Sequence, residues 1–180
     1  MKLWLAIRNA VRGWVEIVRN QDGWREQFSI SGSGLVTALA IYFFFAFVAI
    51  GYGSLGSGLP SGLGIVITLL VQGLSIAALL IAVYLARIIL QLDRPVLDML
   101  VPGIYALTFY LIAGTIVAAM GIQMITLALL AVGYLFYRLG RVAGSWPIGV
   151  SVAFAVLTVA LLVGLPMTLY MLATPAGSPI

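Results

Sequence analysis

The chain has 180 residues, of which 63% are hydrophobic and only 8% are charged, with a formal net charge of +4. Soluble chains carry about 25% charged residues, so this composition excludes a water-soluble globular protein. Cysteine and histidine are both absent, which excludes disulfides, the usual transition-metal sites and Ser-His-Asp or Cys-His catalysis, and we expect neither a metal nor a cofactor.

The first predicted element is an amphipathic helix within residues 1–30, which we expect to be cytoplasmic and to end in a hinge. Apolar residues recur there at spacings of three and four, and charged residues form an opposing stripe. The apolar members are Trp4, Ile7, Val11, Trp14 and Val18, and the charged members are Arg8, Arg12, Glu16 and Arg19. A short stretch with Trp24 and Arg25 leads to the serine and glycine hinge at 31–34.

This amphipathic segment has two interpretations. It is either a topology-setting anchor, or a surface that binds anionic lipid headgroups or a partner protein. The residues of such a lipid- or partner-binding surface are Trp4, Arg8, Arg12, Trp14, Arg19, Trp24 and Arg25.

Three charge-free stretches follow, at 27–86, 99–137 and 142–180. A helical membrane span needs about 20 apolar residues, and glycines and a proline at 51–60 divide the first stretch in two. The second stretch would be about 58 Å long as one helix, so we expect it to turn near Gly121. The predicted spans are about 35–52, 63–86, 101–120, 122–137 and 148–172.

These spans predict an all-α, polytopic transmembrane helical bundle of about five spans over 31–174, preceded by the amphipathic interfacial helix. An uncharged tail follows at 175–180. The span at 122–137 is short, which leaves a re-entrant hairpin as an alternative for spans three and four.

The charges between spans two and three form a predicted interfacial elbow of Arg87, Asp93, Arg94 and Asp98. Arg94 and Asp98 have i,i+4 spacing, which favours an ion pair at a helix start. The elbow is interpreted as snorkelling and helix capping, or alternatively as a docking surface or a catalytic carboxylate pair.

Within the spans, Gln72 and Gln123 are the most notable polar residues. Such side chains commonly form hydrogen bonds between membrane helices. The alternative is that the two amides line a polar cavity.

All nine lysines and arginines fall on one side of the predicted spans. Because Lys and Arg are enriched in cytoplasmic loops, we expect a cytoplasmic N-terminus and an outward C-terminus. Topology therefore explains the positive charge, and no nucleic-acid partner is expected. Eight arginines to one lysine, with abundant Ala, Leu and Gly, suggest a GC-rich bacterial genome and hence an inner membrane.

The five spans, their orientation and the segment 127–164 resemble the Yip1 family of small membrane proteins. In that segment an aromatic-rich helix is followed by Arg138 and Arg141 and then by a further apolar helix. The chain departs from the family by lacking the long cytosolic N-terminal region of eukaryotic members. The resemblance implies a five-span membrane protein, whose eukaryotic relatives organise membrane traffic and bind small GTPases. It assigns no functional residue here.

These features favour a non-enzymatic integral membrane protein that acts as a partner-binding or membrane-organising accessory subunit. Its expected partners are the lipid bilayer and either another membrane protein or further copies of itself. The alternative is a small channel or transporter subunit that uses Gln72 and Gln123. A membrane enzyme that uses Asp93 and Asp98 is the least favoured class.

Overall fold

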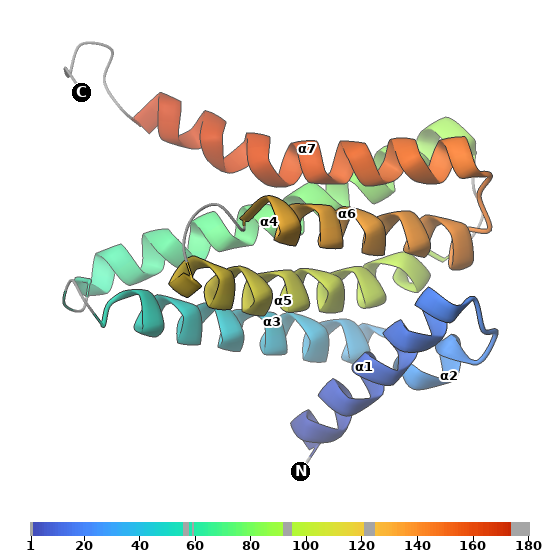
Figure 1. The fold of residues 1–180 in the computed structure, drawn as a ribbon, viewed down its shortest axis with the longest axis horizontal. Helices are drawn as coiled ribbons and strands as arrows, with labels where there is room; N and C mark the ends of the chain where they lie inside the picture. The colour runs from blue at the N-terminus through green and yellow to red at the C-terminus, as the bar shows by residue number, and fades with distance from the viewer. Residues whose placement is uncertain (1, 56–57, 59, 92–94, 121–124, 174–180) are drawn as a thin grey trace.

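The computed structural model describes residues 2–55, 58, 60–91, 95–120 and 125–173. Within these ranges the chain forms seven helices and no strand (Figure 1). The helices are α1 (Lys2–Arg19), α2 (Trp24–Gln27), α3 (Gly32–Gly53), α4 (Gly62–Leu90), α5 (Leu97–Met120), α6 (Ile125–Val142) and α7 (Ile148–Ala173). Helices α3 to α7 are long and apolar enough to cross a membrane. The predicted all-α polytopic bundle is therefore confirmed.

The helix bounds agree with most of the predicted spans. α4 is longer than expected, because it has 29 residues and continues past Arg87. α6 has 18 residues, which corresponds to about 27 Å at 1.5 Å per residue, and its length and apolar composition suffice for a complete span. The predicted turn at Gly121 and the side chain of Gln123 lie outside the described residues.

The spanning helices alternate in direction, so the bundle has two different ends (Figure 1). The described charged residues of α3 to α7 all lie toward the end where α3, α5 and α7 begin, and we call it the basic end. These residues are Arg87, Asp98, Arg138 and Arg141. We call the opposite end, where α3, α5 and α7 terminate, the uncharged end.

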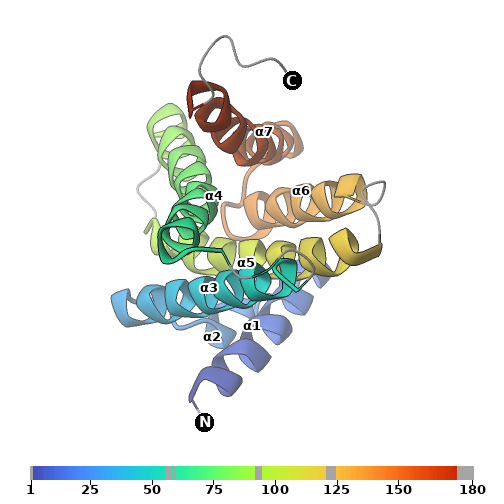
Figure 2. The same ribbon diagram turned by 90° about the vertical axis from the view of Figure 1, so that its left-hand side faces the viewer.

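α5 is the central helix of the bundle. It packs against α3, α4 and α6, while α7 packs against α4 and α6, and Figure 2 shows α5 between α3 and α6. Every residue from 99 to 108 is buried, which includes all faces of the basic half of α5. The buried Thr108 hydroxyl donates to the Ile104 carbonyl at 3.0 Å, so it is satisfied within its own helix.

Serine residues cap the N-termini of two spanning helices, α3 and α4. Ser31 Oγ accepts a hydrogen bond from the Gly34 amide at 3.1 Å, and Ser61 Oγ accepts one from the Gly64 amide at 3.2 Å. These N-caps satisfy amides that have no partner inside the helix. The expected hinge at 31–34 is thus the capped first turn of α3. A Cβ atom on Gly34 would overlap the backbone carbonyl of Ser29.

Replacing Gly34 with alanine is expected to destabilise the protein by about 1–3 kcal/mol, because the new methyl group forces the backbone at Ser29 to move. Thermal unfolding in detergent, followed by circular dichroism, measures the loss. The control is Gly32→Ala in the same turn, where an added Cβ has no other atom within 4 Å. Equal melting temperatures for the two variants would contradict this turn geometry.

Candidate functional site

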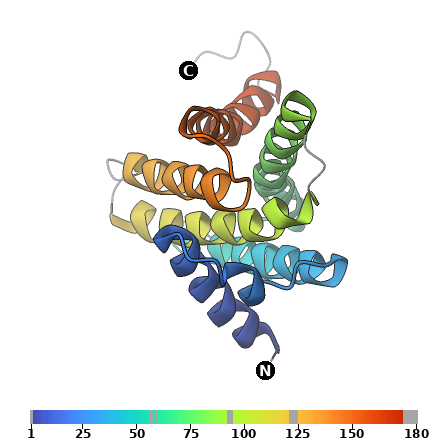
Figure 3. The same cartoon turned by 90° about the vertical axis from the view of Figure 1, so that its right-hand side faces the viewer.

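The first candidate site is α1, which lies obliquely across the basic half of the bundle (Figure 3). One face of α1, with Ala10, Trp14 and Ile17, is buried. The Trp14 Nε1–H donates to the Pro102 carbonyl of α5 at 3.1 Å. Arg138 of α6 donates through Nη2 at 2.9 Å to the Ile17 carbonyl in the last turn of α1, which also accepts from the Asn20 amide at 3.2 Å. These bonds attach α1 to two spanning helices.

α2 and the residues after it extend this attachment. Arg25 Nη2 lies 2.8 Å from Asp98 Oδ2 at the start of α5. The Arg25 side chain is 52% exposed, so solvent screening leaves the pair worth less than about 1 kcal/mol. The larger contribution is apolar. Phe28 packs against Tyr105 with ring centroids 5.8 Å apart and against Trp24 at 6.3 Å, and Gly13 leaves room for its ring.

The structure divides the lipid- or partner-binding surface expected from the sequence. Trp14 and Trp24 are each only 4% exposed, so these two indoles face the bundle and do not form an outward surface. Arg25 is paired with Asp98, but its side chain is 52% exposed, so it remains at the surface. Trp14 is buried because the apolar arc of α1 is wide enough to pack one part against α5 and to present the other part outward.

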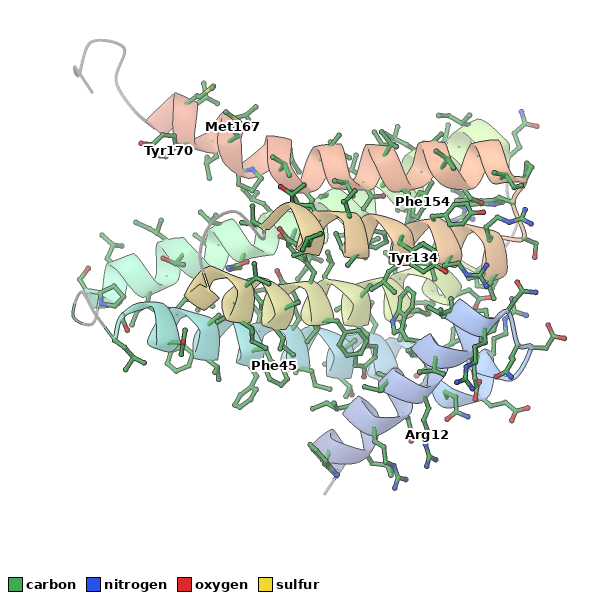
Figure 4. The ribbon with its side chains drawn as sticks, viewed as in Figure 1. Arg12, Phe45, Tyr134, Phe154, Met167 and Tyr170 are labelled. Atoms are coloured by element: carbon green, nitrogen blue, oxygen red, sulfur yellow. The ribbon has the colours of Figure 1, made fainter. Side chains whose placement is uncertain are left out.

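The remaining expected residues lie on the outward part, which we call the free face of α1. Trp4 is 75% exposed, and Val11, Val15 and Val18 are exposed beside it. At 3.6 residues per turn these four positions span about 60° of the helix circumference. The next part of the circumference carries Arg8, Arg12 and Arg19, all exposed. Arg12 projects away from the bundle (Figure 4).

Only part of the predicted interfacial elbow lies within the described residues. Asp93 and Arg94 lie outside the described residues, while Asp98 pairs with Arg25 of α2. Arg87 is exposed, and together with Asp98 and Trp146 it lines a cavity of about 20 Å³, which has room for about one water molecule. Among the described residues no group of three or more His, Cys, Asp or Glu side chains could hold a metal ion.

The second candidate site is a cavity of about 600 Å³ in the half of the bundle toward the uncharged end. We call it the polar recess. Residues from α3, α4, α5, α6 and α7 line it, and none of these lining residues is charged. Its polar side chains are Tyr52, Thr68, Gln72, Ser75, Tyr110 and Thr115. Gln72 therefore lines a cavity whose wall is partly polar, while Gln123, the other amide of the second interpretation, lies outside the described residues.

Hydrogen bonds fix part of this lining. The Tyr42 hydroxyl of α3 donates to the Gln72 backbone carbonyl of α4 at 2.9 Å, and Ser75 hydrogen-bonds to Tyr42. Thr68 and Thr115 donate to carbonyls of their own helices, each at 2.8 Å. The Gln72 side-chain amide also lines the recess. The recess thus offers an amide that can both donate and accept.

The sequence marks Thr68, Ser75 and Thr115 as polar residues within the spans, but sequence reasoning missed the two tyrosines of the recess. Tyr52 and Tyr110 resemble ordinary interfacial aromatic residues in the sequence, and no spacing relates them to Gln72 because each comes from a different helix. Gly114, which also lines the recess, gave no signal for a cavity.

Replacing Trp14 with phenylalanine is expected to loosen α1, because it keeps most of the ring but removes the hydrogen bond to Pro102, worth about 0.5–1.5 kcal/mol. Amide hydrogen exchange in α1 should become faster by up to about tenfold. The matched control is Trp4→Phe, which changes an exposed ring on the same helix. Indistinguishable exchange in the two variants would argue against docking through Trp14.

Comparison of the chain with family models, with curated proteins and with solved structures finds no match. The resemblance to the Yip1 family therefore stays a prediction.

Proposed function

We propose that the protein is a non-enzymatic accessory protein of the bacterial inner membrane that organises anionic lipid at the cytoplasmic surface. The observation that carries this proposal is the free face of α1. An exposed apolar stripe lies directly beside an exposed arginine stripe, on a helix whose opposite side is attached to a membrane bundle. This combination is typical of helices that lie in the interface of an anionic membrane.

The charge distribution supports the orientation in this proposal. The lysine and arginines of the sequence precede α3, lie near the C-terminal ends of α4 and α6, or, in the case of Arg94, fall between α4 and α5 along the sequence. Positive residues favour the cytoplasmic side, where anionic lipids attract each Lys or Arg near the surface by about 1 kcal/mol. The basic end then faces the cytoplasm, and the arginines of α1 lie at the level of the phosphate groups.

A partner protein on the same face is the competing occupant. Bilayer attraction depends mainly on the number of charges, whereas a protein or a specific phosphate site depends on the planar, bidentate geometry of arginine. Substitution by lysine and substitution by glutamine therefore separate the two occupants.

The triple variant R8Q/R12Q/R19Q is expected to lose most of the phosphatidylglycerol that remains bound to the protein after mild detergent extraction. The corresponding triple lysine variant is expected to retain it, because it keeps the three charges. Mass spectrometry of the bound lipid measures both. The single variant Arg87→Gln, which removes an exposed arginine outside α1, is the control and should resemble the wild type.

Two outcomes would count against this proposal. Unchanged phosphatidylglycerol in the triple glutamine variant would show that α1 does not select anionic lipid. A stoichiometric protein that co-purifies with the wild type and is lost from the triple lysine variant would assign the free face to a partner protein.

The polar recess favours a second candidate, a small channel or transporter subunit. Its uncharged polar lining suits a neutral solute. However, the residues that line the recess all lie in the half toward the uncharged end, so the recess alone is not a continuous path across the bundle.

For this second candidate, proteoliposomes that contain only this protein should take up glycerol faster than protein-free vesicles, as measured by light scattering after an osmotic step. Gln72→Leu should reduce the difference, because it removes the amide of the recess. Identical rates with and without protein would reject glycerol transport by the isolated chain.

A further inference from the structure

We infer that the polar recess is a binding site for a neutral lipid with a free hydroxyl group, such as a diacylglycerol. This inference does not depend on the role proposed for α1, since the recess lies in the opposite half of the bundle and shares no lining residue with the free face.

The size and lining of the recess suit a ligand. Its volume of about 600 Å³ lies within the range of about 300–1,000 Å³ that is typical of small-molecule sites. Its lining includes apolar side chains, among them Val71, Leu111 and Leu162, as well as amide and hydroxyl groups. A ligand that fills it must therefore have both an apolar portion and a hydrogen-bonding group.

The charge of the lining selects a neutral head group. No lining residue is charged, and removing an unpaired charge from water into such an environment is strongly unfavourable. A hydroxyl group and ester carbonyls need only neutral partners. The Gln72 amide can donate to a carbonyl and accept from a hydroxyl, and the Tyr110 hydroxyl, which also lines the recess, can donate.

The surroundings of the recess favour the bilayer as the source of the ligand. Exposed apolar side chains adjoin lining residues along three of the spanning helices, namely Val48 of α3, Ile67 of α4 and Met167 of α7. In a membrane these side chains face acyl chains. A lipid can therefore place its head group in the recess while its acyl chains remain in the bilayer.

A substitution at Gly114 can test whether the recess binds the lipid. Gly114 lines the recess, and an added Cβ there would have no atom within 4 Å. Leucine at this position should place its side chain in the recess, and it also favours the helix by roughly 0.8 kcal/mol relative to glycine. Gly73→Leu is the matched control, because Gly73 has the same open space in α4 but does not line the recess.

The experiment measures saturable binding of 1,2-dioctanoylglycerol to the full chain in detergent, by native mass spectrometry and by the rise in melting temperature. We expect wild type and Gly73→Leu to bind equally, Gly114→Leu to bind at least tenfold more weakly and Gln72→Leu several-fold more weakly. 1,2-Dioctanoyl-phosphatidic acid, which replaces the hydroxyl with a charged phosphate, should bind at least tenfold more weakly than dioctanoylglycerol to the wild type.

Three results would overturn the inference. The first is no saturable binding of dioctanoylglycerol to the wild type. The second is a failure of either comparison: folded Gly114→Leu binds dioctanoylglycerol as tightly as the wild type does, or the wild type binds the phosphatidic acid as tightly as dioctanoylglycerol. The third is a rise in melting temperature with free glycerol but not with dioctanoylglycerol, which would assign the recess to a solute that enters from water.

Discussion

The enclosure of α5 is the constraint on which the rest of this structure depends. Over residues 99–108 this helix has no exposed face, so neighbours must cover it on every side. Three spanning helices supply most of the cover. α1 and the aromatic residues around α2 contribute at the basic end, where the Trp14 indole reaches the Pro102 carbonyl and Phe28 packs on Tyr105.

The same constraint explains why the two halves of the bundle differ. α5 is only half-buried over most of 109–117, and it is there that Tyr110, Leu111, Gly114 and Thr115 line the polar recess. Dense packing at one end and a cavity at the other are thus consequences of how closely neighbours surround one helix. The basic half supplies rigidity, and the other half supplies space in which a ligand can be held.

The spans could be predicted from the sequence because long charge-free runs and the fixed rise of an α-helix leave few arrangements. The amphipathic character of α1 was equally evident. The side of α1 that packs against the bundle could not be identified from the sequence. Trp14 and Val11 both belong to the apolar periodic pattern, but in the structure Trp14 is buried against the bundle and Val11 is exposed. The partner of Asp98 was also unpredictable, because Arg25 is 73 residues away along the chain. Gln72 stood out only because an amide is unusual in an apolar span.

The absence of charge from one end of the bundle has a consequence for how the chain enters a membrane. The segments that join or follow the helices there, 54–61, 121–124 and 174–180, contain no Asp, Glu, Lys or Arg. Carrying one charged residue through the bilayer centre costs about 2.5–3.5 kcal/mol on the scale measured for insertion by the translocon. A helical hairpin that carried this uncharged end across a bilayer would therefore not meet that barrier, whereas one that carried the basic end across would meet it at each arginine.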